Sequence, residues 1–282
     1  MERSAIGSIK EIIAYVETHL GDQLNLETVA AAAHYSKYHL CRMFVDITGI
    51  TLHDYIRRRQ LTEAAKLLVF SDKPILEAAL AAGYESQQAF TDVFRAMYKQ
   101  PPLRYRRNGK FYPLQLEFDL YHDPSAPDRM VFNISYAMPE DIPAWMGFVP
   151  LVIDGFPCFD ETMHRRQLER CVEQRQALLL WDKAVVAGAA AVSRQSGSID
   201  FLAVHPQYRQ HGIERVILDF IVHNLLTDRE ISITTFREGD KADTGQRLAY
   251  QRLGFVGTEL SAEFGYPTQR MVLYPGREVF HE

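Results

Sequence analysis

Two stretches of this sequence are copies of one pattern. The stretch that begins at Leu26 can be laid over the stretch that begins at Leu76 without a gap. The matched positions are Leu26-Glu27 with Leu76-Glu77, Ala31-Ala32 with Ala81-Ala82, Ser36 with Ser86, Leu40 with Phe90, Phe44 with Phe94 and Tyr55 with Tyr105. Because a repeat of this kind arises when one supersecondary unit occurs twice, we expect two similar units in the first part of the chain.

Each copy has the pattern of two helices joined by a tight turn. An Ala-rich helix ends near Ala33 in the first copy and near Gly83 in the second, and Ser36 or Ser86 can N-cap the helix that follows. In that second helix, apolar residues recur at i, i+3 and i+4 on one face. They are Leu40, Met43 and Phe44 in the first copy and Phe90, Val93, Phe94 and Met97 in the second. The opposite face is therefore expected to point outward.

The outward face carries side chains suited to reading DNA bases. It presents Lys37, Tyr38, Cys41 and Arg42 in the first copy and Gln87, Gln88, Thr91, Asp92 and Arg95 in the second. Arg and Lys pair with guanine, Gln pairs with adenine, and Thr suits several base edges. The pattern therefore predicts two helix-turn-helix units whose second helices enter the major groove. On the pattern alone, a plain helical bundle with polar outer faces is the alternative.

One long helix is expected between the two copies. Residues 52–70 carry an apolar stripe and the basic run Arg57-Arg58-Arg59. We expect this helix to fix the spacing of the two reading helices, and Arg57 to contact the DNA backbone. In a plain bundle, the basic run would be only a solvated face.

Several runs of residues in the first part of the chain point to one family. They are Ser36-Lys37-Tyr38-His39-Leu40-Cys41-Arg42-Met43-Phe44, Tyr55-Ile56-Arg57, Pro74-Ile75-Leu76, Gly83-Tyr84-Glu85-Ser86-Gln87-Gln88-Ala89-Phe90 and Pro101-Pro102-Leu103-Arg104-Tyr105-Arg106. Through them, residues 23–107 resemble the DNA-binding domain of the AraC/XylS family, particularly its multidrug-resistance and oxidative-stress activators. The resemblance implies a monomer that contacts two adjacent major-groove segments of a promoter and recruits or repositions RNA polymerase.

The same resemblance assigns base contacts to individual residues. The family's contact positions correspond to Tyr38, Arg42, Gln87, Gln88 and Thr91 in this sequence. Asp92 departs from the family pattern, because a basic residue is common there. We therefore expect the second helix-turn-helix unit to read a different sequence or to rely more on the first.

The length and the charge distribution indicate two domains. The chain has 282 residues, roughly twice a typical domain of about 150. Residues 1–107 carry 14 Lys and Arg against 12 Asp and Glu, whereas the remainder carries 17 against 24. The stretch after Arg107 contains Asn108-Gly109 and Asp123-Pro124-Ser125-Ala126-Pro127, which is typical of a linker. We expect an all-α DNA-binding domain over 1–107, a linker over 108–127 and a second domain over 128–282.

Composition excludes several other classes of protein. No apolar run approaches the ~20 residues that a membrane span needs, and no export signal is recognisable at the start. Cys41, Cys158 and Cys171 lack the spacing of metal ligands or of a disulfide framework. We therefore expect no metal site, no membrane partner and a cytoplasmic location.

The second domain has the mixed strand and helix pattern of an α/β layer. Strands are expected at 130–137, 177–181, 185–193, 198–204 and 231–236, and helices near 139–146, 161–176 and 212–226. The run Leu202-Ala203-Val204-His205-Pro206-Gln207-Tyr208-Arg209-Gln210-His211-Gly212-Ile213-Glu214 leads from a strand through a turn into a helix. The free N–H groups at such a helix start can hold a phosphate.

This run and a later one together resemble a known family. The later run is Leu248-Ala249-Tyr250-Gln251-Arg252-Leu253-Gly254-Phe255. In this order, the two are similar to the acetyl-coenzyme A loop and the late Tyr-x-x-Leu-Gly-Phe motif of the GNAT N-acetyltransferases. The similarity covers roughly residues 130–274 and implies a GNAT-like α/β domain with a central mixed sheet.

The GNAT resemblance also assigns roles to residues. Acetyl-coenzyme A would lie against the backbone of Leu202 and Val204, and its pyrophosphate would lie in the loop formed by Arg209, Gln210, His211, Gly212, Ile213 and Glu214. Tyr250 would be the general acid, because a phenol with a pKa of about 10 keeps its proton at pH 7. Glu214 stands where the family has Gly or Ala, and its charge and bulk oppose a pyrophosphate. Alternatively, Tyr250 is a core-edge aromatic residue and Gly212 only a turn residue.

Three interpretations of the whole chain follow. In the first, it is a transcriptional regulator that binds double-stranded promoter DNA, and its GNAT-like domain senses an unknown small-molecule effector or acyl-coenzyme A. In the second, it is both a regulator and an N-acetyltransferase that acts on a small amine or a protein. In the third, the DNA-binding part only targets an enzyme. We take the first as the main hypothesis, and the sequence leaves open whether the chain is an enzyme.

Overall fold

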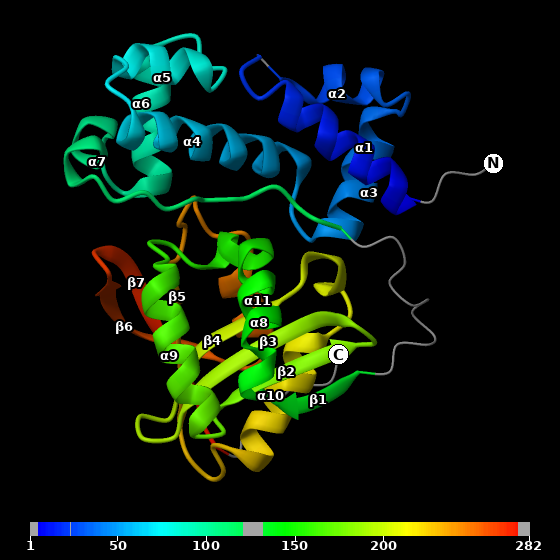
Figure 1. Cartoon of the computed structure of the whole chain (residues 1–282), viewed down its shortest axis with the longest axis vertical. Coiled ribbons are helices and arrows are strands. Elements are labelled where there is room, and N and C mark those ends of the chain that lie inside the picture. Colours follow the sequence, from blue (N-terminus) through cyan, green and yellow to red (C-terminus); the bar gives the residue numbers. More distant parts are fainter. Residues whose placement is uncertain (1–4, 23, 121–131, 276–282) are drawn as a thin grey trace. The chain divides into compact units, whose positions relative to one another are not determined.

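A computed structural model describes residues 5–22, 24–120 and 132–275. The chain forms two compact units, residues 1–124 and 125–282. The described part of the first unit has helices and no strands, and the second unit has a sheet with helices on it (Figure 1). The predicted boundary at residue 127 and the first residues of the strand expected at 130–137 lie outside the described residues. Within the described ranges, no helix is both long and apolar enough to cross a bilayer.

Two helix pairs and one long helix organise the first unit. The elements are α1 (Ala5–Thr18), α2 (Leu26–Ala32), α3 (Lys37–Thr48), α4 (Leu52–Phe70), α5 (Ile75–Ala81), α6 (Gln87–Tyr98) and α7 (Pro102–Asn108). The pairs α2–α3 and α5–α6 are the two copies of the repeat, and α4 connects them over the range that the sequence predicts. The predicted helix-turn-helix architecture is therefore confirmed.

The second helix of each pair begins at the predicted cap. Ser36 Oγ accepts a hydrogen bond from the backbone N–H of His39 at 3.3 Å, and Ser86 Oγ accepts one from Ala89 at 3.2 Å. Each serine thus satisfies one of the N–H groups that a helix start leaves without a partner. These caps fix where α3 and α6 begin, and so which residues their first turns present.

The two turns differ in length by one residue. The first turn places His34 in the left-handed region with φ +58°, and the second places Gly83 there with φ +75°. A Cβ on Gly83 would lie 2.6 Å from the carbonyl oxygen of Asp22, so glycine is required on steric grounds as well. The two copies therefore match residue for residue from Ser36 and Ser86 onward. Before that point, when the copies are aligned, α5 ends one residue earlier than α2.

The core of the first unit follows the predicted apolar faces. Leu40 and Phe44 of α3 and Phe90 and Phe94 of α6 are completely buried. Tyr55 of α4 is also buried, and its ring centroid lies 5.6 Å from that of Phe44. Each reading helix is thus fixed by its inner face, which leaves its outer face available for binding.

Residues 110–120, which we call the strap, belong to this unit and differ from the linker expected over 108–127. They have no regular secondary structure, yet Leu114 and Phe118 are buried, and the Phe118 ring stacks on Tyr55. The backbone N–H groups of Leu114 and Gln115 both donate to Thr62 Oγ1, at 3.0 and 3.3 Å. A free linker would leave these apolar and backbone groups in water, so we propose that any linker starts after the strap.

The basic run of α4 is largely internal, contrary to a solvated face. Arg58 and Arg59 are 2% and 6% exposed. Arg58 donates to the carbonyl oxygen of Leu114 and Arg59 to that of Gln115, which ties α4 to the strap. Arginine can be buried in this way because its long apolar stem packs against other side chains, while hydrogen-bond acceptors such as these carbonyl oxygens satisfy its guanidinium group.

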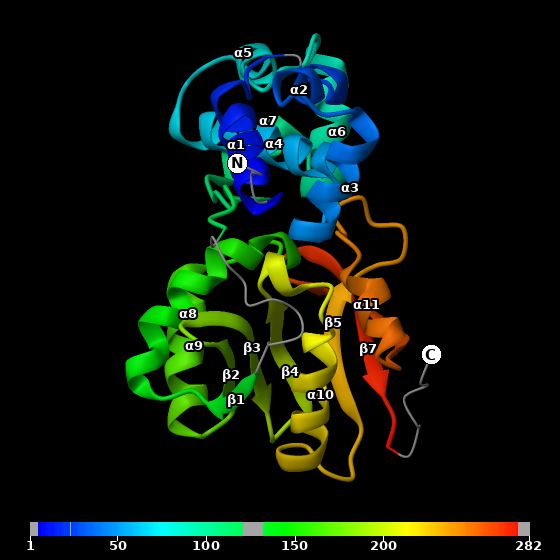
Figure 2. The same ribbon diagram turned by 90° about the vertical axis from the view of Figure 1, so that its right-hand side faces the viewer.

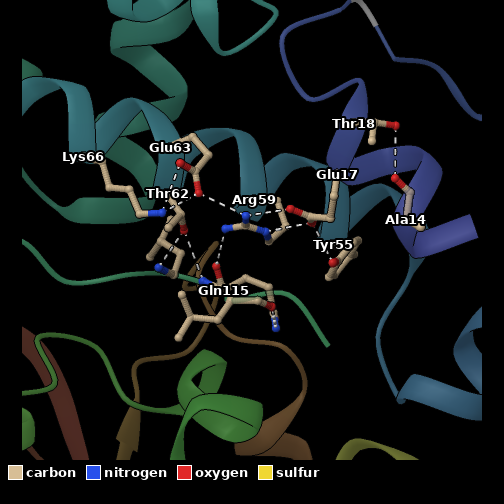
Figure 3. Close-up of polar contacts among 11 residues, drawn as sticks. Ala14, Glu17, Thr18, Tyr55, Arg59, Thr62, Glu63, Lys66 and Gln115 are labelled. Atoms are coloured by element: carbon tan, nitrogen blue, oxygen red, sulfur yellow. Dashed lines mark hydrogen bonds and ion pairs between the residues drawn. The ribbon is translucent and has the colours of Figure 1, made fainter. Parts of the chain in front are cut away.

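A buried ion-pair network joins α1, α4 and the strap (Figure 3). The Arg59 guanidinium donates to both carboxylate oxygens of Glu17 at 2.9 and 2.7 Å, and also to Glu63 at 3.0 Å. The Tyr55 hydroxyl donates to Glu17 at 2.7 Å, and its burial, with the nearby Glu17 charge, raises the pKa of this phenol. Glu17 therefore has a donor on each side, as a buried carboxylate requires.

The second unit is built on one seven-stranded sheet. The strands are β1 (Asn133–Tyr136), β2 (Ala177–Asp182), β3 (Val185–Ser193), β4 (Ser198–Val204), β5 (Ile231–Phe236), β6 (Val256–Glu263) and β7 (Tyr266–Leu273), in the order β1-β2-β3-β4-β5-β7-β6. Neighbouring strands are antiparallel except β4 and β5, which are parallel. The predicted mixed α/β sheet is confirmed, whereas the β6–β7 hairpin and α11 were not predicted as elements.

Helices cover both faces of this sheet (Figure 2). They are α8 (Ile142–Phe148) and α9 (Glu161–Glu173) on one face, and α10 (Ile213–Asn224) and α11 (Gln246–Arg252) on the other, with short 3-10 helices at Pro139–Asp141, Val149–Gly155 and Pro206–Tyr208. Leu178 and Leu180 pack with Ile217 in the core under α10. Phe201 points to the opposite face, where its ring lies 5.4 Å from Trp145.

We expect Arg59→Ala to lower the free energy of unfolding by about 3 kcal/mol, because it leaves the Glu17 carboxylate buried without its cation. The side chains of Arg59 and Glu17 are 7% and 14% exposed. The matched control is Lys66→Ala, which removes a 43% exposed cation that pairs with Glu63, and should cost about 0.5 kcal/mol or less. Urea unfolding followed by circular dichroism at 222 nm measures both. Equal losses in the two variants would contradict the internal role of Arg59.

Candidate functional site

The outer face of α3 projects side chains that the fold does not use. Tyr38 is 88% exposed, and the Arg42 side chain, one turn later, is 86% exposed. Arg42 has a loose contact of 3.8 Å with Asp46, and Lys37 forms an ion pair with Glu27 of α2. Tyr38 and Arg42 thus lie on the exposed face of α3 and take no part in the packing of the unit, which leaves both side chains accessible to a partner.

The outer face of α6 is similarly exposed but its polar groups are partly engaged. Gln87, Gln88 and Arg95 are exposed, and Thr91 is half-buried. The Gln88 amide nitrogen donates to both carboxylate oxygens of Asp92, at 3.2 and 3.1 Å. Asp92 thus holds the Gln88 amide, for which the sequence predicts a base contact.

Arg57 lies apart from the two reading faces. Its side chain is 32% exposed and forms an ion pair with Asp54, one turn earlier in α4. The positive charge of Arg57 also opposes the rise in the pKa of Tyr84, whose main cause is burial, which places Arg57 near the turn between α5 and α6. The structure thus gives Arg57 a different environment from its buried neighbours Arg58 and Arg59.

In the second unit, the strands β4 and β5 separate soon after they begin. Their pairing is limited to Ser198 with Ser232 and Ile199 with Ile233. Beyond these, Leu202 and Val204 pair with β3 on one side, and no residue of β5 pairs with them on the other. This opening leaves an extended backbone edge, which is the geometry that an amide-containing chain can bind by strand-like hydrogen bonds.

The loop predicted to hold a pyrophosphate opens α10 as expected. Gly212 is the N-cap, with φ +67°, and no side chain caps the helix. The Arg209 side chain, however, already has a partner within the protein. Its guanidinium donates to Asp154 at 2.7 Å, and Asp154 is almost fully buried. Gln210 and His211 are exposed, whereas Ile213 is buried in the core under α10.

Glu214 lies in the first turn of α10 and is half-buried. Desolvation raises the pKa of its carboxyl group. Burial, and then the charges of Glu214 and Asp243, raise the pKa of the Tyr250 phenol as well. Tyr250 is buried, and its hydroxyl lies 3.5 Å from the carbonyl oxygen of Leu202, at the long limit for a hydrogen bond.

These residues fit only one part of acetyl-coenzyme A. The open edge of β4 suits the amide-containing arm of the coenzyme. The cradle for the pyrophosphate fits poorly, because the Arg209 guanidinium is already paired with Asp154 and the Glu214 carboxyl group stands in the first turn of α10, where its ionised form would repel the pyrophosphate. The chain's own residues thus oppose the most highly charged part of the coenzyme.

A cavity of about 630 Å³ opens beside the same strands. Its walls come from residues 155–160, from α9, from the separating ends of β4 and β5, and from the tip of the β6–β7 hairpin. Leu202 and Tyr250 also line it. The cavity therefore lies next to the open edge of β4, within the second unit.

Sequence reasoning missed most of this cavity. The run Phe156-Pro157-Cys158-Phe159, which forms one wall, lies between predicted elements and was assigned no role. Its density of aromatic residues in a non-helical segment was the available signal. The Asp154–Arg209 pair had no local signal, because its partners are 55 residues apart.

Comparison with protein families separates the chain in the same way. Residues 29–108 match the family described as a helix-turn-helix domain, and residues 151–274 match the acetyltransferase (GNAT) domain. Members of the second family use acyl-coenzyme A in general. Both resemblances drawn from the sequence are therefore confirmed.

Individual relatives match the first unit. The transcriptional regulator Rob of Salmonella typhimurium is 43% identical over 105 residues, which is 37% of this chain and 36% of Rob. The regulatory protein SoxS of Escherichia coli is 43% identical over 98 residues, which is 35% of this chain and 92% of SoxS. The chain thus spans about a third of the length of Rob but almost all of SoxS.

The second unit is similar to a solved acetyltransferase of the GNAT family from Bacillus cereus. The identity is 12%, the TM-score is 0.43, and the similarity covers 52% of this chain and 99% of that one. Because nearly the whole of SoxS is matched at high identity, the chain belongs to the AraC-type helix-turn-helix family through its first unit, and it carries a GNAT domain after that unit.

Proposed function

We propose that the protein is a transcriptional regulator that binds a specific promoter site in double-stranded DNA through α3 and α6. The observation that carries this proposal is the exposure of Tyr38 and Arg42, on a helix that is capped and fixed by its buried face. Relatives of this unit are named as regulators, which supports the same assignment. A rigid helix with an unused polar face is what major-groove reading requires.

Each reading helix has its own set of contacts in this proposal. In α3, Lys37, Tyr38 and Arg42 face the first major-groove segment; in α6, Gln87, Gln88, Thr91 and Arg95 face the second. Arg57 contacts a phosphate near the α5–α6 turn, where it positions the protein without reading sequence. RNA polymerase is the proposed protein partner, and the cytoplasm, where bacterial promoters are, is the proposed place of action.

The second unit, in this proposal, senses a small-molecule effector. The cavity beside β4 supports a ligand-binding role, and the poor fit of the pyrophosphate cradle argues against coenzyme turnover as its main task. Binding of the effector changes the affinity of the protein for DNA.

Acetyl transfer to an amine is the second candidate, favoured by the open edge of β4 and by Tyr250 beside it. Tyr250 keeps its proton, because burial raises its pKa, and a protonated phenol is what a general acid needs. In that case Leu202 and Val204 would bind the coenzyme arm through their backbone.

We expect Arg42→Ala to weaken binding to the cognate site by about 1–3 kcal/mol and to relax the base preference at one position. Tyr38→Ala should also weaken binding while leaving stability unchanged, because the ring is in water. Arg104→Ala on α7 is the control, since it removes the same exposed charge outside both reading helices. A site selected from random duplexes and fluorescence anisotropy provide the measurement. Unchanged affinity in Arg42→Ala would mean that α3 is not a reading helix.

Asp92→Ala should change the base preference of the second segment, because it frees the Gln88 amide to pair with adenine. The control is Glu85→Ala, which removes an exposed carboxylate other than the one that the Gln88 amide donates to. Site selection followed by sequencing compares the two variants. If Asp92→Ala and the control selected the same bases as the unchanged protein, Gln88 would not be a base contact.

Glu214→Gly and Glu214→Gln should each raise the affinity for acetyl-coenzyme A by about tenfold if the charge of Glu214 repels the pyrophosphate. The Gln variant keeps the size of the side chain, so a gain in Gly alone would identify bulk as the obstacle. Calorimetric titration of the full chain measures the affinity. No gain in either variant would remove Glu214 as the cause of the poor fit.

A further inference from the structure

The cavity of the second unit combines aromatic walls with an excess of negative charge. The inference drawn from this combination names the chemical class of the effector, and so rests on the sensing role proposed above. The cavity is large enough for a small organic molecule with several rings. The side chains that line the cavity therefore decide which class of ligand it binds.

Its walls are aromatic on several sides. Phe156 stacks on Phe201, with ring centroids 4.6 Å apart and an angle of 12° between the rings. Phe159 and Phe264 also line the cavity, and Phe264 is 79% exposed at the hairpin tip. Aromatic faces carry partial negative charge and attract cations that lie over them.

His164 contributes a ring rather than a charge. Trp145 Nε1 donates to His164 Nε2 at 3.0 Å, so this nitrogen has no proton of its own. Burial lowers the pKa of the imidazole to about 4, which keeps it neutral near pH 7. His164 therefore adds no positive charge that would repel a cation.

The ionised groups that line the cavity are mostly acids. Asp160, Asp200 and Glu263 are carboxylates, and Arg170 is the one Lys or Arg among the lining residues. Asp160 is occupied as the N-cap of α9, where it accepts from Met163, and Arg170 donates to Gln167. This leaves Asp200 and Glu263 as carboxylates that can face a ligand.

Asp200 lacks a cationic partner within the described part of the chain. It accepts a hydrogen bond from Ser198 Oγ at 2.5 Å, and desolvation raises the pKa of its carboxyl group. Asp200 is exposed, so it is accessible to a ligand, and a bound cation would stabilise the ionised form of this acid because opposite charges attract.

We propose that this cavity binds an organic cation with a multi-ring or branched apolar body. The apolar body contacts Phe156, Phe201 and the neighbouring rings, and the positive charge lies near Asp200 and Glu263. Neither recognition element requires a transferable proton on the ligand, so a permanently charged cation fits as well as an amine.

Two probes of the same shape and opposite charge test this. Tetraphenylphosphonium and tetraphenylborate are titrated calorimetrically into the full chain. We expect the cation to bind at least about tenfold more tightly than the anion, which corresponds to 1.4 kcal/mol. Equal binding of the two probes, or a preference for the anion, would overturn the proposal.

Matched variants locate the binding site. Asp200→Asn and Glu263→Gln should each weaken binding of tetraphenylphosphonium by about tenfold. The control is Glu259→Gln on the same strand as Glu263, whose side chain is 77% exposed and outside the cavity lining. If the control lost as much affinity as the two cavity variants, the cation would be held by the general negative charge of the unit, and the site would be wrong.

The same samples separate this inference from the proposed function. DNA affinity is measured with and without tetraphenylphosphonium, and we expect it to change with the cation and to lose that response in Asp200→Asn. Cation binding that leaves DNA affinity unchanged would support the site and contradict the sensing role. DNA binding without any cation preference would overturn the site and leave the DNA-binding proposal in place.

Discussion

The short parallel pairing of β4 and β5 is the constraint on which the second unit depends. Two residue pairs hold the strands together at Ser198 and Ile199, and beyond them the strands separate. The separation exposes the edge of β4, gives Tyr250 access to the carbonyl oxygen of Leu202, and opens the cavity beside them. If more residues of β4 and β5 paired, all three features would be lost, because the backbone of β5 would occupy the space beside β4.

The first unit depends instead on how its long helix is held. Arg59 joins α4 to Glu17 of α1 and to the backbone of the strap, in a region where an unpaired charge would be costly. With α4 fixed in this way, the two reading helices are attached to a rigid connector. Within this unit, the placement of α3 and α6 therefore depends on buried contacts away from their outer faces.

Much of this architecture was predictable, because local signals specify it. Ser36 and Ser86 marked the starts of α3 and α6, and an unbroken apolar stripe marked α4 from Leu52 to Phe70. Strands β2 to β5 are buried and rich in apolar residues, so their ranges were also predicted closely. In each case, apolar residues recur at a short regular spacing along the sequence, and the face that they form is buried.

The features that the sequence did not predict lack such a regular spacing of apolar residues. Strand β6 is an edge strand with mostly exposed residues, so no apolar alternation marks it. The strap is buried without regular structure, and Arg58 and Arg59 are charged residues inside a core, which a hydropathy pattern assigns to the surface. The cavity brings together residues 155–160, α9 and the hairpin tip, which only the folded sheet places side by side.

The acidic character of the second unit connects its poor fit to the coenzyme with its proposed ligand. Glu214 opposes a pyrophosphate at the start of α10, and Asp200 and Glu263 would oppose any anion in the neighbouring cavity. The same negative field attracts a cation and concentrates it near the crevice. In our proposal, this GNAT domain binds a cation in a cavity whose lining carries more acids than bases, and the start of α10 beside it disfavours a pyrophosphate. Glu214 is the feature that favours sensing over acetyl transfer, because it opposes the negatively charged coenzyme, whereas an acidic cavity suits a protonated amine acceptor as well as a sensed cation.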